Sequence, residues 1–307
     1  MDSKGRNLVI ILGPTGVGKS AAGICLAEKF NGEIINCDSM QVYEEFDIGT
    51  DKPTPGMRQK TPHHLLDIVA WSTQFTAADF VREALAAIHL INGKGKLPFI
   101  VGGTGLYLKA LLEGLFPGPG KDAGLRERLE KEARTAGLDS LRKKLEEVDP
   151  SYARLIGPRD KMRMIRALEV YYLTGQPLSL HFFKTSPPLA DFHLLKIGLQ
   201  LERKELYRRI EERVERMFKN GIVMEVENLL AKGVEASAPP FRALGYKYVL
   251  QFLKKGISLE EAVAMTKRDT RRYAKRQVTW FKKMAGINWF IADDYSSLSR
   301  FLEANLA

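Results

Sequence analysis

Short apolar runs separated by polar and Gly-rich segments predict a sheet of buried strands in this chain. Runs of strand length occur at residues 7–12, 33–37, 97–101 and 193–201. The first run leads through GPTGVGKS into a helical stretch, AAGICLAEKF, and the third leads through a Gly-rich turn into a helix expected over residues 106–112. Strands that alternate with helices are typical of an α/β fold with a parallel sheet.

The pattern changes to charged helices after the breaker PGPG at residues 117–120. The sequence LRERLEKEARTAGLDSLRKKLEEVDP, which starts at Leu125, has helical character, and so do residues 161–173. We therefore predict a mainly helical insertion domain over residues 121–190, set into an α/β core formed by residues 1–120 and 191–307. The C-terminal part of that core is expected to be mostly helical, with breaks at the following glycines: Gly221, Gly233, Gly245 and Gly256.

The composition fits a folded protein that works in the cytoplasm. With 307 residues and 45% hydrophobic content, the chain can fill one large core and a smaller embedded one. The sequence has no run of about 18 apolar residues, and its N-terminus lacks the plan of a secretion signal. Cys25 and Cys37 have neither CxxC nor metal-ligand spacing, so we expect them to be packing residues.

The charge of the chain suggests a polyanionic partner. The formal net charge is +10 and the isoelectric point is about 9.4. Basic surfaces attract phosphate chains and release their counterions. A merely solvated positive face gives the same composition, so the position of the charges along the chain must decide between the two interpretations.

The turn after the first strand carries a specific motif. Gly13-x-x-x-x-Gly18-Lys19-Ser20 matches the Walker A pattern of phosphate-binding loops (P-loops), and it has the flanking strand and helix that such a loop requires. Backbone N–H groups of such a loop close around phosphate oxygens, Lys19 bridges phosphates, and the Ser20 hydroxyl can ligate Mg²⁺. The fold class is therefore predicted as a P-loop NTPase-like parallel sheet flanked by helices. The expected phosphate-binding residues are Gly13, Pro14, Thr15, Gly16, Val17, Gly18, Lys19 and Ser20.

Two further polar side chains follow strands of the same sheet. Asp38 comes directly after the second strand, and Thr104 lies in a Gly-Gly-Thr-Gly turn after the third. Because ligands bind at the carboxyl ends of strands in open α/β sheets, both are expected to face the P-loop crevice. Asp38 is the only well-placed acid after the early strands, and its role as a Mg²⁺ ligand, a catalytic base or a cap stays open. Thr104 is either a helix N-cap or a hydroxyl group in the crevice.

A basic segment at residues 267–283 suggests contact with RNA. It holds eight basic residues, one acid and three aromatics. Arg268, Arg272 and Arg276 are spaced to line one face of a helix, while Tyr273 or Trp280 can stack on an unpaired base. The alternative is a solvated basic face whose aromatic residues belong to the core.

Taken together, six motifs of the chain resemble the bacterial tRNA dimethylallyltransferases, also called tRNA isopentenyltransferases. Their order and their spread over nearly the whole chain are more specific than the P-loop alone. The motifs are GPTGVGKS at 13–20, DSMQVY at 38–43, VGGTGLY at 101–107, RMIRALEVY at 163–171, FRALGYK at 241–247 and RRYAKRQVTWFK at 271–282.

The resemblance implies a P-loop that holds the diphosphate of dimethylallyl diphosphate. The acceptor would be the exocyclic amine of the adenine immediately 3′ to the anticodon of tRNA. Asp38 would accept the proton of that amine, and Thr104 would position the reacting groups. Lys19, the loop amides, Mg²⁺ held near Ser20, and Arg166 would neutralise the departing diphosphate.

The resemblance also implies a set of tRNA-binding residues. We expect a monomer that binds the anticodon stem-loop of tRNA and has no contact with a membrane. The residues placed against the tRNA are Asp38, Ser39, Met40, Gln41, Thr104, Arg126, Met162, Arg163, Met164, Ile165, Arg166, Arg242, Gly245, Tyr246, Lys247, Arg272, Lys275, Arg276, Gln277, Trp280 and Lys282.

Three other functions share parts of this pattern. A P-loop kinase or NTPase for a small metabolite would use Asp38 on Mg²⁺ or on the acceptor hydroxyl. A non-enzymatic RNA-binding protein would use a nucleotide only as a switch. A prenyl transferase that modifies free AMP or ATP would need no long cationic surface, so the basic segment speaks against it.

Overall fold

The computed structural model describes residues 6–116, 118–182 and 185–306, so Pro117 of the predicted breaker lies outside the described residues. The chain divides into two compact units. One unit comprises Met1–Lys109 and Asp191–Ala307 and is called the α/β unit below; the other comprises Ala110–Ala190 and is called the helical unit. A separate domain is one that folds independently. That residues 121–190 form such a domain stays a prediction.

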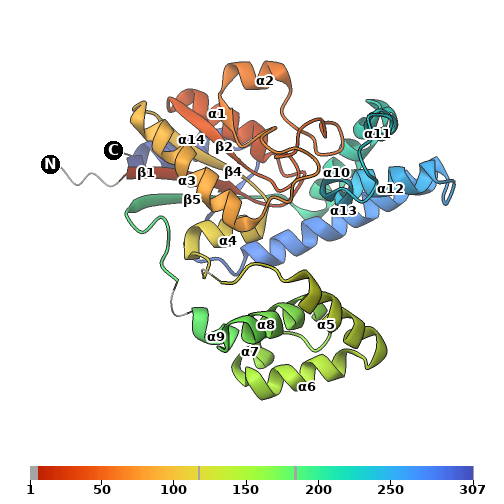
Figure 1. Cartoon of the computed structure of the whole chain (residues 1–307). Coiled ribbons are helices and arrows are strands. Elements are labelled where there is room, and N and C mark those ends of the chain that lie inside the picture. Colours follow the sequence, from red (N-terminus) through yellow and green to blue (C-terminus); the bar gives the residue numbers. More distant parts are fainter. Residues whose placement is uncertain (1–5, 117, 183–184, 307) are drawn as a thin grey trace. The chain divides into compact units, whose positions relative to one another are not determined.

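A parallel sheet forms the centre of the α/β unit (Figure 1). The order of its strands is β3-β2-β4-β1-β5-β6, and every pair of neighbours is parallel. This arrangement confirms the predicted fold class. The strands are β1 Arg6–Leu12, β2 Gly32–Cys37, β3 His63–His64, β4 Leu97–Gly102, β5 Phe192–Gln200 and β6 Asn288–Ile291.

Helices cover the sheet because its strands are apolar on both faces. Along β1, Val9 and Ile11 pack into the same cluster as α1 and α14, whereas Leu8 and Ile10 point to the opposite face by the alternation of a strand. The α3 helix packs against β2 and β4 and contributes the fully buried Phe80. The helices are α1 Lys19–Lys29, α2 Pro55–Lys60, α3 Ala77–Gly93, α4 Gly105–Glu113, α10 Arg203–Lys219, α11 Ile222–Ala231, α12 Leu244–Leu253, α13 Leu259–Phe281 and α14 Tyr295–Leu306, with a short 3₁₀ helix at Pro239–Arg242.

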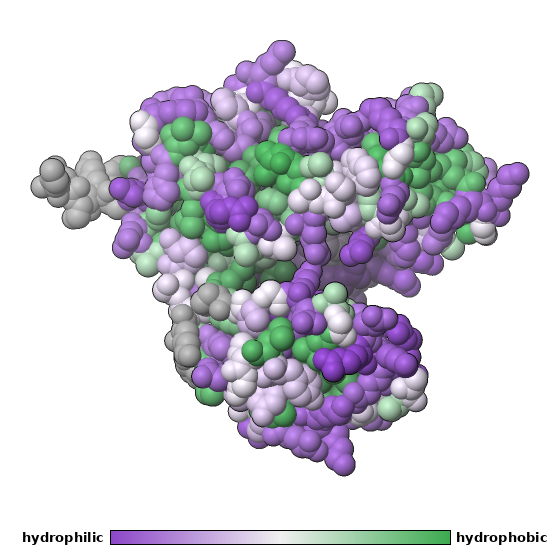
Figure 2. Space-filling model, in the orientation of Figure 1, coloured by the Kyte–Doolittle hydropathy of each residue, from purple (hydrophilic) through white to green (hydrophobic). Residues whose placement is uncertain are grey.

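Charged amphipathic helices build the helical unit around a leucine-rich core. Leu125 and Leu129 pack with Leu141 and Leu145, while the polar residues of these helices face outward. Hydrophilic residues cover much of the visible face of each unit in Figure 2, with hydrophobic residues in smaller patches between them. The helices are α5 Ala123–Thr135, α6 Leu138–Val148, α7 Pro150–Leu155, α8 Lys161–Thr174 and α9 Leu178–His181.

The C-terminal part of the chain departs from the prediction at two places. Gly245 is not a break, because it lies inside α12, where a Cβ atom would come within 2.9 Å of Ile222 Cδ1. The glycine is needed there for close packing rather than for a turn. The second departure is β6, a short edge strand whose burial pattern carries no alternation that would identify it. No helix in the described part of the chain is long and apolar enough to cross a membrane.

Candidate active site

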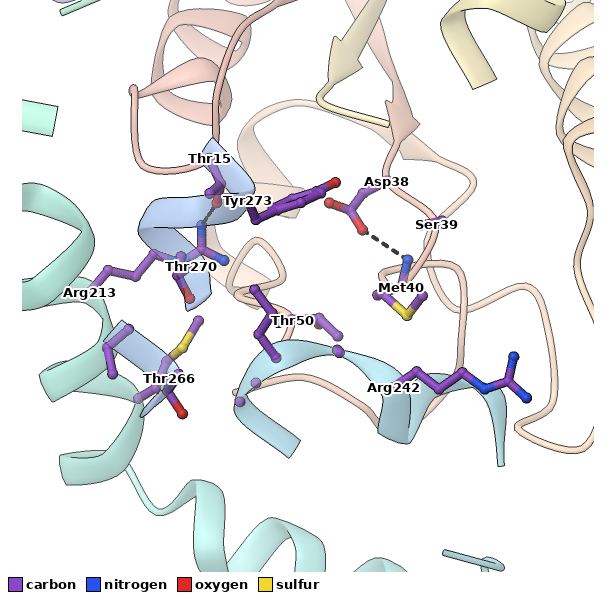
Figure 3. A pocket seen from close by; sticks show the side chains of 16 residues that line it. Thr15, Asp38, Ser39, Met40, Thr50, Arg213, Arg242, Thr266, Thr270 and Tyr273 are labelled. Carbon is purple, nitrogen blue, oxygen red and sulfur yellow. Dashed lines mark hydrogen bonds between the residues drawn. The ribbon is translucent and has the colours of Figure 1, made fainter. Parts of the chain in front are cut away.

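Polar groups from three neighbouring strand ends meet at one edge of the sheet. The P-loop follows β1, Asp38 follows β2, and Thr104 follows β4. A cavity of about 310 Å³ opens at this edge (Figure 3). This volume is at the lower end of the range for small-molecule sites. Its lining is Thr15, Asp38, Ser39, Met40, Gly49, Thr50, Arg213, Val214, Met217, Arg242, Ala243, Leu244, Gly245, Thr266, Thr270 and Tyr273.

Asp38 and Thr104 lie on adjacent turns that a hydrogen bond joins. One carboxylate oxygen of Asp38 accepts a bond of 2.8 Å from the backbone N–H of Met40, which fixes the side chain in a tight turn. The next residue, Ser39, donates its N–H to Thr104 Oγ1 at 3.1 Å. The hydroxyl of Thr104 therefore holds the turn that carries Asp38, whereas only Asp38 of the two is among the residues that line the cavity.

The P-loop borders a second cavity, of about 380 Å³, called the P-loop cavity below. Gly16 and Gly18 have φ angles of 81° and 101°, which only glycine adopts without strain, and α1 begins at the following residue, Lys19. The N-terminus of a helix favours anions because its first N–H groups are unpaired. The lining of the P-loop cavity is Gly16, Gly18, Lys19, Ser20, Ala21, Asp51, Arg208, Arg209, Glu212, Arg213 and Arg216.

Lys19 is an ammonium group that lacks an anionic partner in the described part of the chain. Its Nζ donates to the carbonyl oxygen of Pro14 at 2.9 Å, and no carboxylate there forms an ion pair with it. Burial, followed by repulsion from Arg213, lowers the pKa of Lys19 to about 8. A phosphate group in the P-loop would oppose both effects, because negative charge beside the amine raises its pKa.

Arg213 of α10 is a residue of this site that sequence reasoning missed. Its Nη1 donates to Thr15 Oγ1 at 2.7 Å, so the guanidinium lies against the P-loop. Its Nε lies 3.2 Å from Asp51 Oδ2 but is buried and has no well-aligned hydrogen-bond partner. Arg213 borders both cavities, where it can bind an anion shared between them. The sequence gives no signal for it, because α10 holds many similar arginines.

Tyr273 of α13 lines the first cavity and faces Asp38 (Figure 3). Burial, followed by the negative charge of Asp38, raises the pKa of this phenol to about 12. The guanidinium of Arg276 lies 5.7 Å from the ring centre. The aromatic group is therefore available as a wall of the pocket, next to the carboxylate.

The basic face predicted for residues 268, 272 and 276 exists on α13. These three arginines are exposed, but Arg268 and Arg272 pair with Asp269. Arg276 is exposed without a carboxylate partner in the described residues, as are Lys275 and Lys282. The ring of Trp280 packs over Gly105 at the start of α4, and it is half-buried.

Several residues expected to contact RNA have buried side chains. Tyr246 is fully buried and donates to Glu225 at 2.7 Å. Gln277 is 6% exposed, and the oxygen and nitrogen of its side-chain amide both form hydrogen bonds within the α/β unit. Gly245 is also buried in the packing of α12, whereas Arg242 and Lys247 are exposed close by. Arg242 and Lys247 can therefore contact a ligand, whereas the buried residues pack inside the protein.

The predicted residues 126 and 162–166 belong to the helical unit. Arg126 and Arg166 both pair with the fully buried Glu169, whose carboxylate also accepts the N–H of Asp122. These contacts lower the pKa of Glu169 to about 2, against the opposing effect of burial. In this unit Met164 and Ile165 are buried in the core, whereas Met162 and Arg163 are exposed.

A metal ion would find few ready ligands in this site. The described residues contain no group of three or more His, Cys, Asp or Glu side chains that could hold one. Ser20 and Asp51 both border the P-loop cavity and are oxygen donors of the kind that Mg²⁺ takes. Mg²⁺ is often held by only one or two protein groups together with substrate phosphates, so these donors fit an ion that binds along with a diphosphate.

The chain is similar to known proteins over nearly its whole length. A model of the IPP transferase family matches residues 41–284. A tRNA dimethylallyltransferase 2 of Geotalea uraniireducens (strain Rf4) is 51% identical over 284 residues, which cover 92% of this chain and 91% of that protein. A tRNA dimethylallyltransferase of Pelotomaculum thermopropionicum is 45% identical and covers 96% of this chain and 94% of that protein.

Solved structures show the same fold. The full-length tRNA isopentenylpyrophosphate transferase of Bacillus halodurans is 39% identical and matches with a TM-score of 0.72 over 98% of this chain and 97% of that chain. A eukaryotic dimethylallyltransferase acting on tRNA is 33% identical and matches with a TM-score of 0.81 over 98% of this chain and 76% of that chain. The phosphate-binding loop, the acid at the neighbouring strand end and these matches along nearly the whole chain lead to one assignment: the chain belongs to the IPP transferase family.

Proposed function

We propose that this chain transfers the dimethylallyl group of dimethylallyl diphosphate to the exocyclic amine of the adenine 3′-adjacent to the anticodon in tRNA, releasing diphosphate. The observation that carries the proposal is that Arg213 joins two cavities, one bordered by the P-loop and the other by Asp38. A diphosphate in one cavity and an acceptor beside Asp38 in the other can thus bind side by side. The names of the relatives supply the substrate class.

The donor diphosphate is assigned to the P-loop cavity. The amides at the start of α1, the ammonium of Lys19 and the guanidinium of Arg213 converge there. Charge on the diphosphate grows as its bond to the allylic carbon breaks, and fixed cations and amides stabilise that charge best when it is largest. Arg166 was expected to take part, but it belongs to the helical unit, where it pairs with Glu169, so its contact with the diphosphate stays a prediction.

Mg²⁺ would be held by Ser20, with Asp51 as a second oxygen donor of the same cavity. When bound, the ion would supply positive charge to the oxygens of the leaving diphosphate. No nucleotide needs to be hydrolysed in this reaction, because the P-loop serves only to bind the diphosphate of the donor.

The acceptor reaction is assigned to the first cavity. A bond forms between the adenine amine nitrogen and the allylic carbon while the bond from that carbon to the diphosphate oxygen breaks, and Asp38 takes the proton of the nitrogen. The free carboxylate oxygen of Asp38 faces the pocket beside Tyr273 (Figure 3). Val214, Met217 and Leu244 supply an apolar surface in the same cavity for the dimethylallyl chain.

The tRNA would reach this cavity through the basic surfaces of the α/β unit. Arg276 and Lys275 of α13, together with Arg242 and Lys247 near α12, are exposed cations that can contact phosphates. A target base in a single-stranded loop can leave its stack at a cost of about a few kcal/mol. We propose that the protein acts as a monomer, since the site described above is built from one chain.

The proposal is tested by incubating the protein with Mg²⁺, labelled dimethylallyl diphosphate and an unmodified anticodon stem-loop. AMP and ATP serve as parallel acceptors, and a stem-loop with guanine in place of the target adenine serves as the matched control. Label in the adenine stem-loop alone is the expected result. Label in AMP would change the acceptor to a free nucleotide, and label in none of the acceptors would remove the proposed function.

A further inference from the structure

Gln277 differs from its neighbours on α13, and the proposed reaction gives it no role. Lys275 and Arg276 are exposed, as expected for residues that contact RNA, but Gln277 is 6% exposed. A buried polar side chain on a basic helix has to find hydrogen-bond partners inside the protein. The partners of Gln277 identify what it does.

The amide of Gln277 connects two of the turns that form the active site. Its Oε1 accepts the N–H of Thr15, in the P-loop, at 2.8 Å. Its Nε2 donates to the carbonyl oxygen of Gly103, in the turn after β4, at 2.8 Å. One partner is a donor and the other an acceptor, so the amide has a single orientation that satisfies both.

The turn after β4 leaves room for this amide only because residue 103 is glycine. A Cβ atom at Gly103 would lie 2.6 Å from Gln277 Nε2 and 3.4 Å from Lys19 Nζ. Any larger residue would push the amide away from the carbonyl that it binds. The close approach of the two turns therefore depends on both residues together.

Each end of this bridge continues to a group with a role in the proposed reaction. Thr15 accepts a hydrogen bond from Arg213 through its hydroxyl, on the side of the diphosphate. Gly103 precedes Thr104, whose hydroxyl accepts the N–H of Ser39, the residue after Asp38. The bridge thus lies between the groups that bind the leaving group and the group that takes the proton.

We propose that Gln277 is a positioning residue that fixes the P-loop relative to the turn that supports Asp38, and that its side chain does not read RNA. The inference rests on the proposed function. Because α13 also carries the exposed cations, Gln277 connects the RNA-facing helix directly to the donor site. A misplacement of reacting groups by about 1 Å can cost a factor of about 10² in rate, which sets the scale of the effect.

The test compares Gln277→Met, which keeps the size of the side chain but forms neither hydrogen bond, with the same substitution at Gln59, which is exposed on α2. Gln277→Met is expected to lower kcat by about 10²-fold with an unchanged Kd for the stem-loop. Gln59→Met is expected to change neither kcat nor the Kd for the stem-loop. Gly103→Ala reaches the same bridge from the other side and should reproduce the loss of kcat without any change on α13.

A second measurement does not depend on turnover. Binding of inorganic diphosphate with Mg²⁺, followed by calorimetry, should weaken in Gln277→Met and Gly103→Ala but not in Gln59→Met. If the wild-type protein transfers no prenyl group yet shows this pattern, the proposed function fails and the positioning role stands. The inference is overturned if Gln277→Met weakens stem-loop binding at unchanged kcat, or if kcat and diphosphate binding both stay at wild-type values in a variant that melts at the wild-type temperature.

Discussion

Asp38 is the residue on which the proposed chemistry depends most directly. Its carboxylate is anchored through one oxygen by the Met40 N–H, which leaves the other oxygen directed into the pocket. An exocyclic amine is a weak nucleophile because its lone pair is delocalised into the ring. Removal of its proton during attack is therefore the step at which a fixed carboxylate helps most.

Asp38→Asn keeps the shape of the side chain and the acceptor for the Met40 N–H but removes the base. We expect the rate of prenyl transfer to fall by about 10²- to 10⁴-fold, with the Kd for the stem-loop nearly unchanged. Single-turnover kinetics and a filter-binding assay measure the two quantities. The exposed Asp139 on α6 provides a control, Asp139→Asn, that should not change the rate. A rate at the wild-type level in Asp38→Asn would remove Asp38 as the base.

Lys19 makes diphosphate binding depend on pH. Its pKa in the ligand-free protein is about 8, so in the window between pH 8 and the ordinary value of 10.5 the amine has already lost most of its charge. Bound diphosphate raises this pKa, and binding in that window therefore takes up a proton. The cost of burying the charged amine is present below pH 8 and is relieved as the pH rises through this window.

We expect the affinity for inorganic diphosphate to fall above pH 8 by up to about tenfold per pH unit. Calorimetry in buffers of different ionisation enthalpy also measures the proton uptake. In Lys19→Arg the guanidinium stays charged over the whole range, so only the ionisation of diphosphate itself remains in the pH profile. The same pH profile in both proteins would show that the amine of Lys19 does not titrate in this range.

At the scale of elements, α11 and α12 support the loop that forms one wall of the cavity. Glu225 accepts the backbone N–H groups of Asp47 and Ile48, each at 2.8 Å, and Tyr246 donates to the same carboxylate. The phenol oxygen of Tyr246 also accepts the N–H of Gly49, which lines the cavity. Tyr246 thus contributes to the site from inside the core.

Glu225→Ala removes the carboxylate that holds the loop against α11, so these N–H groups are left without an acceptor. We expect the free energy of unfolding to fall by about 1.5–3 kcal/mol, the usual value for hydrogen bonds to a charged group. Urea denaturation measures the loss. Glu227→Ala, on the exposed face of the same helix, removes an equal charge and should have almost no effect. Equal stability of the two variants would mean that the loop does not depend on Glu225.

The basic face of α13 is the element that we expect to determine the salt dependence of RNA binding. Arg276 is free of carboxylate partners in the described residues, whereas Arg272 shares Asp269 with Arg268. Each arginine that contacts a phosphate contributes about one unit to the slope of log affinity against log salt.

Replacement of Arg272 and Arg276 by alanine should weaken binding of the stem-loop and reduce that slope by up to about two. Binding at several salt concentrations gives both values. The control removes the same charge from exposed positions on other helices, with Lys29→Ala and Arg300→Ala. Equal slopes for the two double variants would show that the face of α13 is only solvated.

At the scale of the whole molecule, each compact unit has its own core, and the helical unit also has a buried electrostatic centre. In the helical unit this centre is Glu169, which is fully buried between Arg126 and Arg166. Its pKa of about 2 lies below the ordinary value of 4.5, so its stabilising effect is present above pH 4.5 and is lost as the pH falls towards 2.

Glu169→Ala leaves two partly buried arginines unpaired, and we expect it to destabilise the helical unit by about 3–5 kcal/mol. The midpoint of the unfolding transition of this unit should fall, while binding of inorganic diphosphate by the α/β unit should be retained. In wild type, stability should decrease between pH 4.5 and 2 more steeply than in Glu169→Gln, which cannot titrate. Unfolding curves of both variants, recorded as a function of pH, measure these effects.

Sequence by itself determined the features that depend on local pattern. The P-loop, the strands before it and after it, and the turns that carry Asp38 and Thr104 are continuous motifs, and their place at the carboxyl ends of parallel strands follows from general rules of α/β folds. Residue spacing likewise predicted an arginine face on α13, because helical periodicity is local. The resemblance carried by six motifs predicted the family.

Tertiary structure alone decided which polar side chains meet. Arg213 lies on a helix with many arginines and Gln277 lies among basic residues, and each contacts the P-loop from about 200 or more positions away in the sequence. Tyr246 belongs to a motif that resembles an RNA-binding one, but packing of α12 against α11 directs its side chain into the core. The physical reason is the same in each case: a helix pattern states which face is apolar, whereas the partner of a polar group is set by how distant elements pack together.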